Sequence, residues 1–137
     1  MNVELRNKLV EKLRGREPLQ LVSLEDFFTG NDDEGSIGCN LTMHPGVDVF
    51  YETLRQIRAR PNVQDVLIEI TDLQEDDLTT WPFSDTVYIL ADATESQVEE
   101  WLQRLSPDES PEAGVDESAS TGVKLQLGIK VFIAWWD

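Results

Sequence analysis

The chain has 137 residues, of which 40% are hydrophobic, so it is long enough for one domain with a buried core of its own. It carries 27 acidic and 11 basic residues, a formal net charge of −16, and a single cysteine. One cysteine excludes an internal disulfide, and a chain this acidic is expected to repel nucleic acid and anionic membranes.

The N-terminal part of the chain predicts two helices. Leucines recur at every fourth position with Lys and Arg between them, which predicts an amphipathic helix that ends near Gly15 and has one apolar stripe: Leu5, Leu9 and Leu13. This stretch lacks the apolar core of a signal peptide, and no apolar run is long enough to span a membrane, so we expect a cytoplasmic protein. Ser23 is then placed to cap a short second helix over about 24–29, which Gly30 ends.

A third helix and two strands are predicted in the middle of the chain. Pro45 suits the first position of a helix that Pro61 ends, and the apolar residues between them share one stripe: Val47, Phe50, Leu54 and Ile57. The segment 63–70 is rich in β-branched residues and 85–91 is apolar at its centre, so both are predicted to be strands. The acidic connection between them is too long for a tight hairpin.

The last part of the chain predicts a helix, a linker and a strand. Thr94 and Gln97 stand at the N-cap and N3 positions of a helix whose apolar residues share one face: Val98, Trp101, Leu102 and Leu105. Residues 106–122 are mostly Pro, Ser, Gly, Ala and acids, which predicts a mobile acidic linker. Apolar residues alternate over 123–135 with one phase through Gly128, which is compatible with one long strand that completes the core.

Together these elements predict a single α+β domain over residues 1–137. We expect a small mixed sheet of three to five strands with about three helices packed on it. The strand 85–91, the following helix and the strand 123–135 could form a right-handed crossover, and this is why we expect the sheet to be mixed.

The sequence GNDDEGSIGCNLTMH, residues 30–44, contains the only cysteine and the only histidine of the chain. It does not fit a calcium loop, because placing its central glycine at the turn position of an EF-hand leaves both terminal ligand positions without a carboxylate. It also lacks the paired ligand spacing of a structural zinc site. One alternative is a small metal-dependent or Cys/His-based enzyme that uses four side chains of this loop: Asp32, Asp33, Cys39 and His44.

A structural interpretation of the same loop is the one we favour. Ile37, Cys39 and Leu41 alternate, so we expect Cys39 to face the core as a small apolar side chain. The glycines and acids are then expected to shape the chain ahead of the helix that follows Pro45. Neither a P-loop nor a G-x-S-x-G motif is present, and we expect no cofactor.

The acidic charge is concentrated in the second part of the chain. Residues 1–60 hold 8 basic and 10 acidic side chains, whereas residues 61–137 hold 3 and 17. Aromatic residues in charged surroundings are typical of interface hot spots, so we select these candidate partner-binding residues: Glu75, Asp76, Asp77, Trp81 and Phe83. The leading hypothesis is a non-enzymatic protein-binding or regulatory module that presents an acidic face to a basic protein, and a homodimer is compatible with it.

The same acids could instead form a catalytic carboxylate pair with Asp85, as in glycosidases. The sequence does not fix the separation of these carboxyl groups. We favour the simpler interpretation, an acidic loop that the sequence WPF holds against the hydrophobic core.

Three segments resemble a group of small, acidic bacterial proteins. They read GNDDEGSIGCNL with a following HPG, VQDVLIEI, and WPFSDTVYIL, and they cover about the middle half of the chain. That group has no established activity, so the resemblance implies no functional residues.

Overall fold

A five-stranded antiparallel sheet with strand order β1-β2-β3-β5-β4 forms the centre of the protein. The structure, a computed structural model, describes residues 1–14, 21–108, 112–114 and 123–136. The strands are β1 (Leu21–Ser23), β2 (Val63–Glu69), β3 (Thr86–Ala91), β4 (Glu112–Gly114) and β5 (Lys130–Trp135). The helices are α1 (Val3–Leu13), α2 (Leu24–Phe28), α3 (Val47–Arg58) and α4 (Glu95–Leu102), with 3₁₀ turns η1 (Glu34–Ser36) and η2 (Gln103–Leu105). The α+β class predicted from the sequence is confirmed.

Helices α1, α2 and α4 begin where the sequence provides a capping side chain, whereas α3 begins after Gly46 without one. Asn2 accepts from the Leu5 amide at the start of α1, and Ser23 accepts from the Asp26 amide at the start of α2. At α4, Thr94 and Gln97 form the predicted capping box, in which each side chain accepts from the backbone N–H of the other residue. These local bonds fix where α1, α2 and α4 start.

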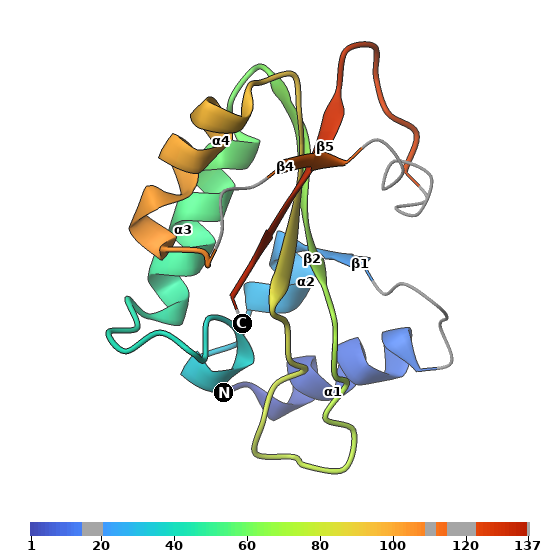
Figure 1. Ribbon diagram of the computed structural model, residues 1–137. Helices are drawn as coiled ribbons and strands as arrows, with labels where there is room; N and C mark the ends of the chain where they lie inside the picture. Colours follow the sequence, from blue (N-terminus) through green and yellow to red (C-terminus); the bar gives the residue numbers. More distant parts are fainter. Residues whose placement is uncertain (15–20, 109–111, 115–122, 137) are drawn as a thin grey trace.

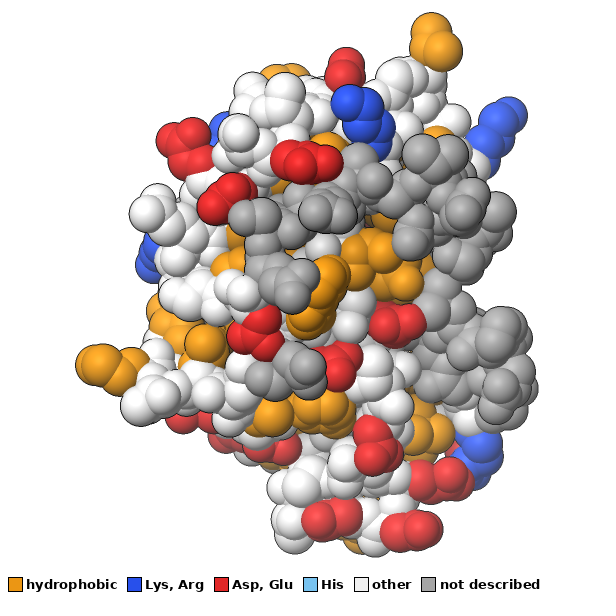
Figure 2. Space-filling model, in the orientation of Figure 1, with side chains coloured by type: hydrophobic (Ala, Val, Ile, Leu, Met, Phe, Trp, Pro, Cys, Tyr) orange, Lys and Arg blue, Asp and Glu red, His pale blue; other side chains and the backbone are white. Residues whose placement is uncertain are grey.

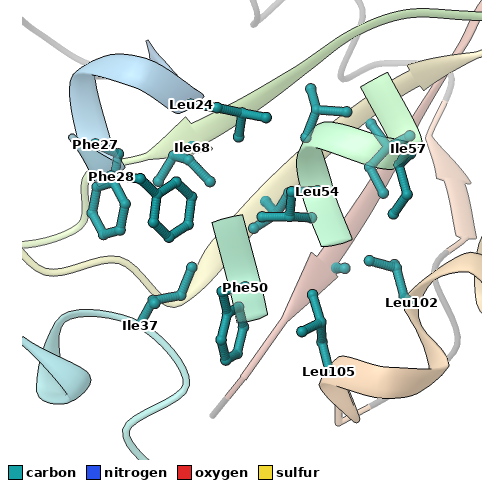
Figure 3. Close-up of a cluster of buried hydrophobic side chains, with 14 of the residues drawn as sticks. Leu24, Phe27, Phe28, Ile37, Phe50, Leu54, Ile57, Ile68, Leu102 and Leu105 are labelled. Atoms are coloured by element: carbon teal, nitrogen blue, oxygen red, sulfur yellow. The ribbon is translucent and has the colours of Figure 1, made fainter. Parts of the chain in front are cut away.

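The main core lies between the helices and one face of the sheet, and Figure 1 shows α3 and α4 together on one side of the strands. Alternate strand residues point into it, such as Val66 and Ile68 of β2, and they meet the apolar stripe of α3. Figure 3 shows part of this cluster, with Phe50 and Leu54 among the residues that lie between helix and strands. Trp136 is 1% exposed and its indole N–H donates to the Leu105 carbonyl at 2.7 Å, so the C-terminal strand completes the core as expected.

The opposite face of the sheet carries a smaller apolar cluster. Its buried members are Leu67, Tyr88, Leu90 and Val131. Part of its cover comes from the segment before β5, whose residues Val123, Leu125 and Ile129 pack against the cluster. Gln64 on β2 holds this segment by two hydrogen bonds, to the Lys124 carbonyl and from the Gln126 amide. The sheet is therefore not left open on this side.

The strand pairing differs from the mixed sheet that we expected. β5 runs antiparallel to β3, so these two strands do not form a crossover unit. The chain leaves β3, passes α4 and first forms β4 at the sheet edge, and β5 then runs back between β3 and β4. β4 lies inside the predicted linker 106–122, where a three-residue strand leaves no periodic signal. The rest of that linker beyond residue 108 lies outside the described residues, apart from these three.

The last strand is also shorter than the predicted 123–135. Gly128 has φ +84° and the Ile129 amide donates to the Gln126 carbonyl at 3.1 Å, so the chain turns here. This turn separates the segment 123–127 from β5, although both contribute to the second cluster. An alternating pattern cannot distinguish one long strand from a strand and a covering segment with the same phase.

Candidate functional site

The acidic connection between β2 and β3, residues 71–84, forms a closed loop, which we call the acidic loop. Its two arms pair at the base, where the Phe83 amide donates to the Asp72 carbonyl at 2.7 Å and the Asp72 amide donates to the Phe83 carbonyl at 3.2 Å. Inside the loop, Asp77 accepts from both the amide and the hydroxyl of Thr79, at 2.9 and 2.6 Å. These Asx-type contacts turn the chain locally, without help from a helix or strand.

A buried arginine fixes the backbone of the acidic loop. Arg6 on α1 is 1% exposed, and its guanidinium donates to backbone carbonyls of four loop residues: Gln74, Glu75 at 3.5 Å, Asp77 at 2.9 Å and Thr80 at 3.0 Å. A buried cation is tolerated only when its donors are satisfied, and the rigid fork of an arginine can serve several carbonyls at once. The conformation of the loop is thus set by a side chain that lies 68 to 74 positions earlier in the chain.

The side chains of the acidic loop point outward from this fixed backbone. Glu75, Asp76 and Asp77 are exposed, and Leu78 beside them is 58% exposed. The hydrogen bonds from Thr79, with the charge of Arg6 nearby, hold the pKa of Asp77 below its usual range, so this carboxyl is ionised. Figure 2 shows Asp and Glu side chains at the lower end of the molecule, where Figure 1 places this loop. The loop presents negative charge around one apolar side chain.

Trp81 does not lie on this surface, although we selected it as a contact residue. It is 1% exposed and belongs to the main core, and Phe83 is half-buried at the base of the loop. Both side chains hold the acidic loop against the core, as in the simpler interpretation of the sequence WPF. Burying a Trp contributes to this, because it removes a large apolar area from water. The exposed apolar residue of the loop is Leu78 instead, which the sequence analysis did not select.

The glycine-rich loop 30–44 packs beside the acidic loop and supports it. Asp33 uses both carboxylate oxygens: one accepts from the Gly35 amide at 2.9 Å and the other from the Trp81 amide at 3.0 Å. Buried Asn31 donates to the hydroxyl of buried Ser36 at 3.0 Å. The Ser36 carbonyl in turn accepts from the Ser84 amide at 2.8 Å. This polar network joins the two loops, so the carboxylate of Asp33 has a structural role here.

The four side chains of the alternative metal or Cys/His interpretation share no hydrogen-bond or ion-pair partner among the described residues. Asp32 is exposed and pairs with the N-terminal amine of Met1 at 2.9 Å. Both ring nitrogens of His44 are occupied, since Nε2 donates to the Ile37 carbonyl at 2.7 Å and Nδ1 accepts from the Gly46 amide at 2.9 Å. Within the described ranges no group of three or more His, Cys, Asp and Glu side chains is placed to hold a metal ion.

Cys39 is exposed, where we expected it to face the core. Gly38 before it has φ +66°, so the chain turns and the alternation of Ile37, Cys39 and Leu41 is not that of a strand. A side chain at position 38 would also collide with Phe50, whose ring lies 2.7 Å from the position of the missing Cβ. The turn buries Ile37 and leaves the thiol at the surface.

The fold and the loop define a small α+β protein with helices on one face of an antiparallel sheet and a braced acidic loop at one end. The chain belongs to the Uncharacterized protein YfbO family, whose model matches residues 4–134. It is similar to Uncharacterized protein YfbO of Escherichia coli (strain K12), with 36% identity over 121 residues that cover 88% of this chain and 84% of the relative. The resemblance to a group of bacterial proteins without an established function is thereby confirmed. No solved structure matches the chain.

None of the helices in the described residues combines the length and the apolar composition required to cross a bilayer.

Proposed function

We propose that this protein is a non-enzymatic binding module whose acidic loop docks on a basic surface of a partner protein. The observation that carries the proposal is the Arg6 contact with the loop carbonyls, because it fixes the backbone of a loop whose exposed side chains are charged. A loop that is rigid before binding loses less conformational entropy when it docks. Acidic side chains that only solvate a surface do not require a fixed backbone.

The exposed side chains of the loop indicate what kind of surface the partner would have. Asp76 and Asp77 next to Leu78 suit a surface with Lys or Arg around a shallow apolar socket. Glu75 is less available, since its carboxylate accepts from Arg14 at 2.8 Å. The negative charge would accelerate the encounter with such a partner, and Leu78 would add affinity after contact.

Affinity capture with a pair of matched variants tests the proposal. Tagged wild-type protein is incubated with native lysate and washed at low and then at high salt, and retained proteins are identified by mass spectrometry. The test variant Asp76→Lys/Leu78→Ala changes the exposed loop without touching Asp77, which shapes it. We expect a basic protein that the wild type retains at low salt and the variant loses, with affinity reduced about tenfold or more.

The control variant makes the same two changes elsewhere. Glu99→Lys/Leu127→Ala alters one exposed acid on α4 and a fully exposed leucine, so charge and apolar content match the test variant. The control should retain the partner as the wild type does. Equal retention by all three proteins would contradict the proposal, and equal loss from both variants would assign the binding to net charge instead of the loop.

A further inference from the structure

A shallow pocket of about 520 Å³ lies beside α4 and shares no residue with the acidic loop. Its size falls in the range of small-molecule sites. Two arginines, two glutamines, one glutamate and one tryptophan line it: Arg60, Arg104, Gln97, Gln103, Glu100 and Trp101. In a chain of net charge −16, this pocket has more positive than negative side chains.

Arg60 is held in place over an aromatic ring. Its guanidinium carbon lies 4.6 Å from the centre of the Trp101 ring. The backbone is fixed as well, because the Arg60 amide donates to the Ile57 carbonyl and the Arg60 carbonyl accepts from the Val63 amide, both at 3.1 Å. The neighbouring Asn62 ties this turn to Asp92, just before α4, by two further bonds. The two sides of the pocket are thus connected.

The two arginines of the pocket have no acidic partner in the part of the chain that the structure describes. Some other basic residues do, such as Arg58 with Glu25 at 2.7 Å and Lys12 with Asp26 at 2.5 Å. Glu100 and Arg104 stand four residues apart around α4 and η2, yet they form no ion pair within 4 Å. Both guanidinium groups therefore keep their N–H donors available for a ligand.

Gln97 adds a donor of fixed orientation. Its side-chain oxygen accepts from the Thr94 amide at 2.9 Å in the capping box. The amide NH₂ group at the same end of the side chain remains free to donate into the pocket that Gln97 lines. Glu100 is the one carboxylate in the lining, and it suits a hydroxyl or amine on the ligand.

We infer that this pocket binds a small molecule with a terminal oxyanion, either a phosphate or a carboxylate. Arg60, stacked on Trp101, provides the planar fork that holds two oxygens of such a group, and Arg104 provides the second charge. The long-range repulsion from the acidic chain acts weakly on a ligand at this site, since salt screens charges beyond about 8 Å under physiological conditions. The inference does not depend on the acidic loop or on its partner.

Titration with two simple anions tests the inference. Sodium phosphate or sodium acetate is added to ¹⁵N-labelled protein at fixed pH, with chloride adjusted to keep the ionic strength constant. We expect saturable shifts of the Trp101 indole signal and of the Arg60 and Arg104 side-chain signals. Saturation by phosphate alone or by acetate alone identifies the ligand group, and either result supports the site.

A matched arginine on α3, outside the pocket, provides the control. Arg55 also lies over an aromatic ring, at 5.0 Å from the centre of Tyr51, and it is exposed outside the pocket. Arg60→Gln should weaken binding about tenfold and Arg60→Lys by less, because a lysine keeps the charge but loses the fork. Arg55→Gln should leave the dissociation constant unchanged.

Two results would overturn the inference. One is a set of shifts that grow linearly with both anions and are spread over all basic residues. The other is an equal loss of binding in Arg60→Gln and Arg55→Gln, since that assigns the effect to net charge alone. Spectra of each variant before titration show whether it is folded, so a folding defect cannot be read as a loss of binding.

Discussion

At the scale of single residues, the burial of Arg6 is the feature that shapes the candidate site. The buried face of α1 consists of Arg6, Leu9, Val10 and Leu13, so the arginine continues the apolar stripe toward the acidic loop. Its partners at the loop are backbone carbonyls, which do not change with the loop's side chains. Substitutions of exposed side chains such as Asp76 and Leu78 therefore leave the contacts of Arg6 intact, whereas Asp77 and Trp81 have structural roles of their own.

The substitution Arg6→Lys tests this role. A lysine keeps the charge but has a compact ammonium group that cannot reach all of the loop carbonyls, so buried acceptors lose their donors. We predict that the free energy of unfolding falls by about 2 kcal/mol, measured by urea denaturation. Amide hydrogen exchange in residues 74–80 should accelerate more than exchange in β2 and β3.

An exposed arginine provides the comparison for this substitution. Arg55→Lys on α3 alters no buried contact and should change the stability by less than about 0.5 kcal/mol. If Arg6→Lys matched Arg55→Lys in stability and in loop exchange, the carbonyl contacts of Arg6 would not hold the loop.

At the scale of elements, the second face of the sheet combines apolar and acidic residues. Glu69 ends β2 on the same side as Leu67, and its register partner across the sheet is Thr86 at the start of β3. Half-burial, and secondly the charge of Asp85, raise the pKa of the Glu69 carboxyl. The ionised form is disfavoured in the folded state, so this strand end works against stability at neutral pH.

The substitution Glu69→Gln should therefore stabilise the protein at pH 7. Because the folded pKa lies above the unfolded one, the wild type gains stability as the pH falls from the folded value to the unfolded value, near 4.3. We predict a gain for Glu69→Gln of about 0.5 kcal/mol at pH 7, allowing for solvent screening, and a much smaller gain at pH 4. Urea denaturation at both pH values measures it.

The exposed Glu99→Gln on α4 serves as the reference for this pH dependence. This substitution removes one exposed acid, so it controls for the loss of a negative charge at the surface. A stability gain of Glu69→Gln that persisted unchanged at pH 4 would assign the effect to packing instead of ionisation.

At the scale of the whole molecule, local signals predicted the long elements and missed what depends on distant contacts. The caps at Ser23 and Thr94 are set by residues three positions away, so the sequence was sufficient for both helix starts. β1 and β4 have three residues each and exist only through pairing with longer strands, which leaves no periodicity to detect.

The candidate site was predictable only in part, and the reason is again distance in the chain. The acids of residues 75–77 are exposed as any charged run is expected to be. The side chain that holds their backbone, Arg6, lies on α1. An arginine next to a leucine stripe is normally expected to be solvent-exposed. Leu78 and Cys39 are exposed because both lie in tight turns, where the sequence pattern of apolar residues does not predict burial. Side-chain burial at such turns follows from tertiary packing, which periodicity does not encode.

The surplus of 27 acidic over 11 basic residues predicts how the stability of the whole protein depends on salt. Ion pairs such as Lys8–Glu4 and Arg14–Glu11 are exposed at both partners and contribute little, whereas repulsion acts among all the acids. Sodium chloride screens both effects, so the repulsion should decide the sign. We predict that the unfolding midpoint rises by roughly 4 °C, or about 1 kcal/mol, between low and physiological salt. Chloride is the appropriate anion, because sulfate also strengthens apolar burial. A midpoint that falls with added chloride would mean that the ion pairs outweigh the repulsion, and the acidic surface would then be part of what stabilises the fold.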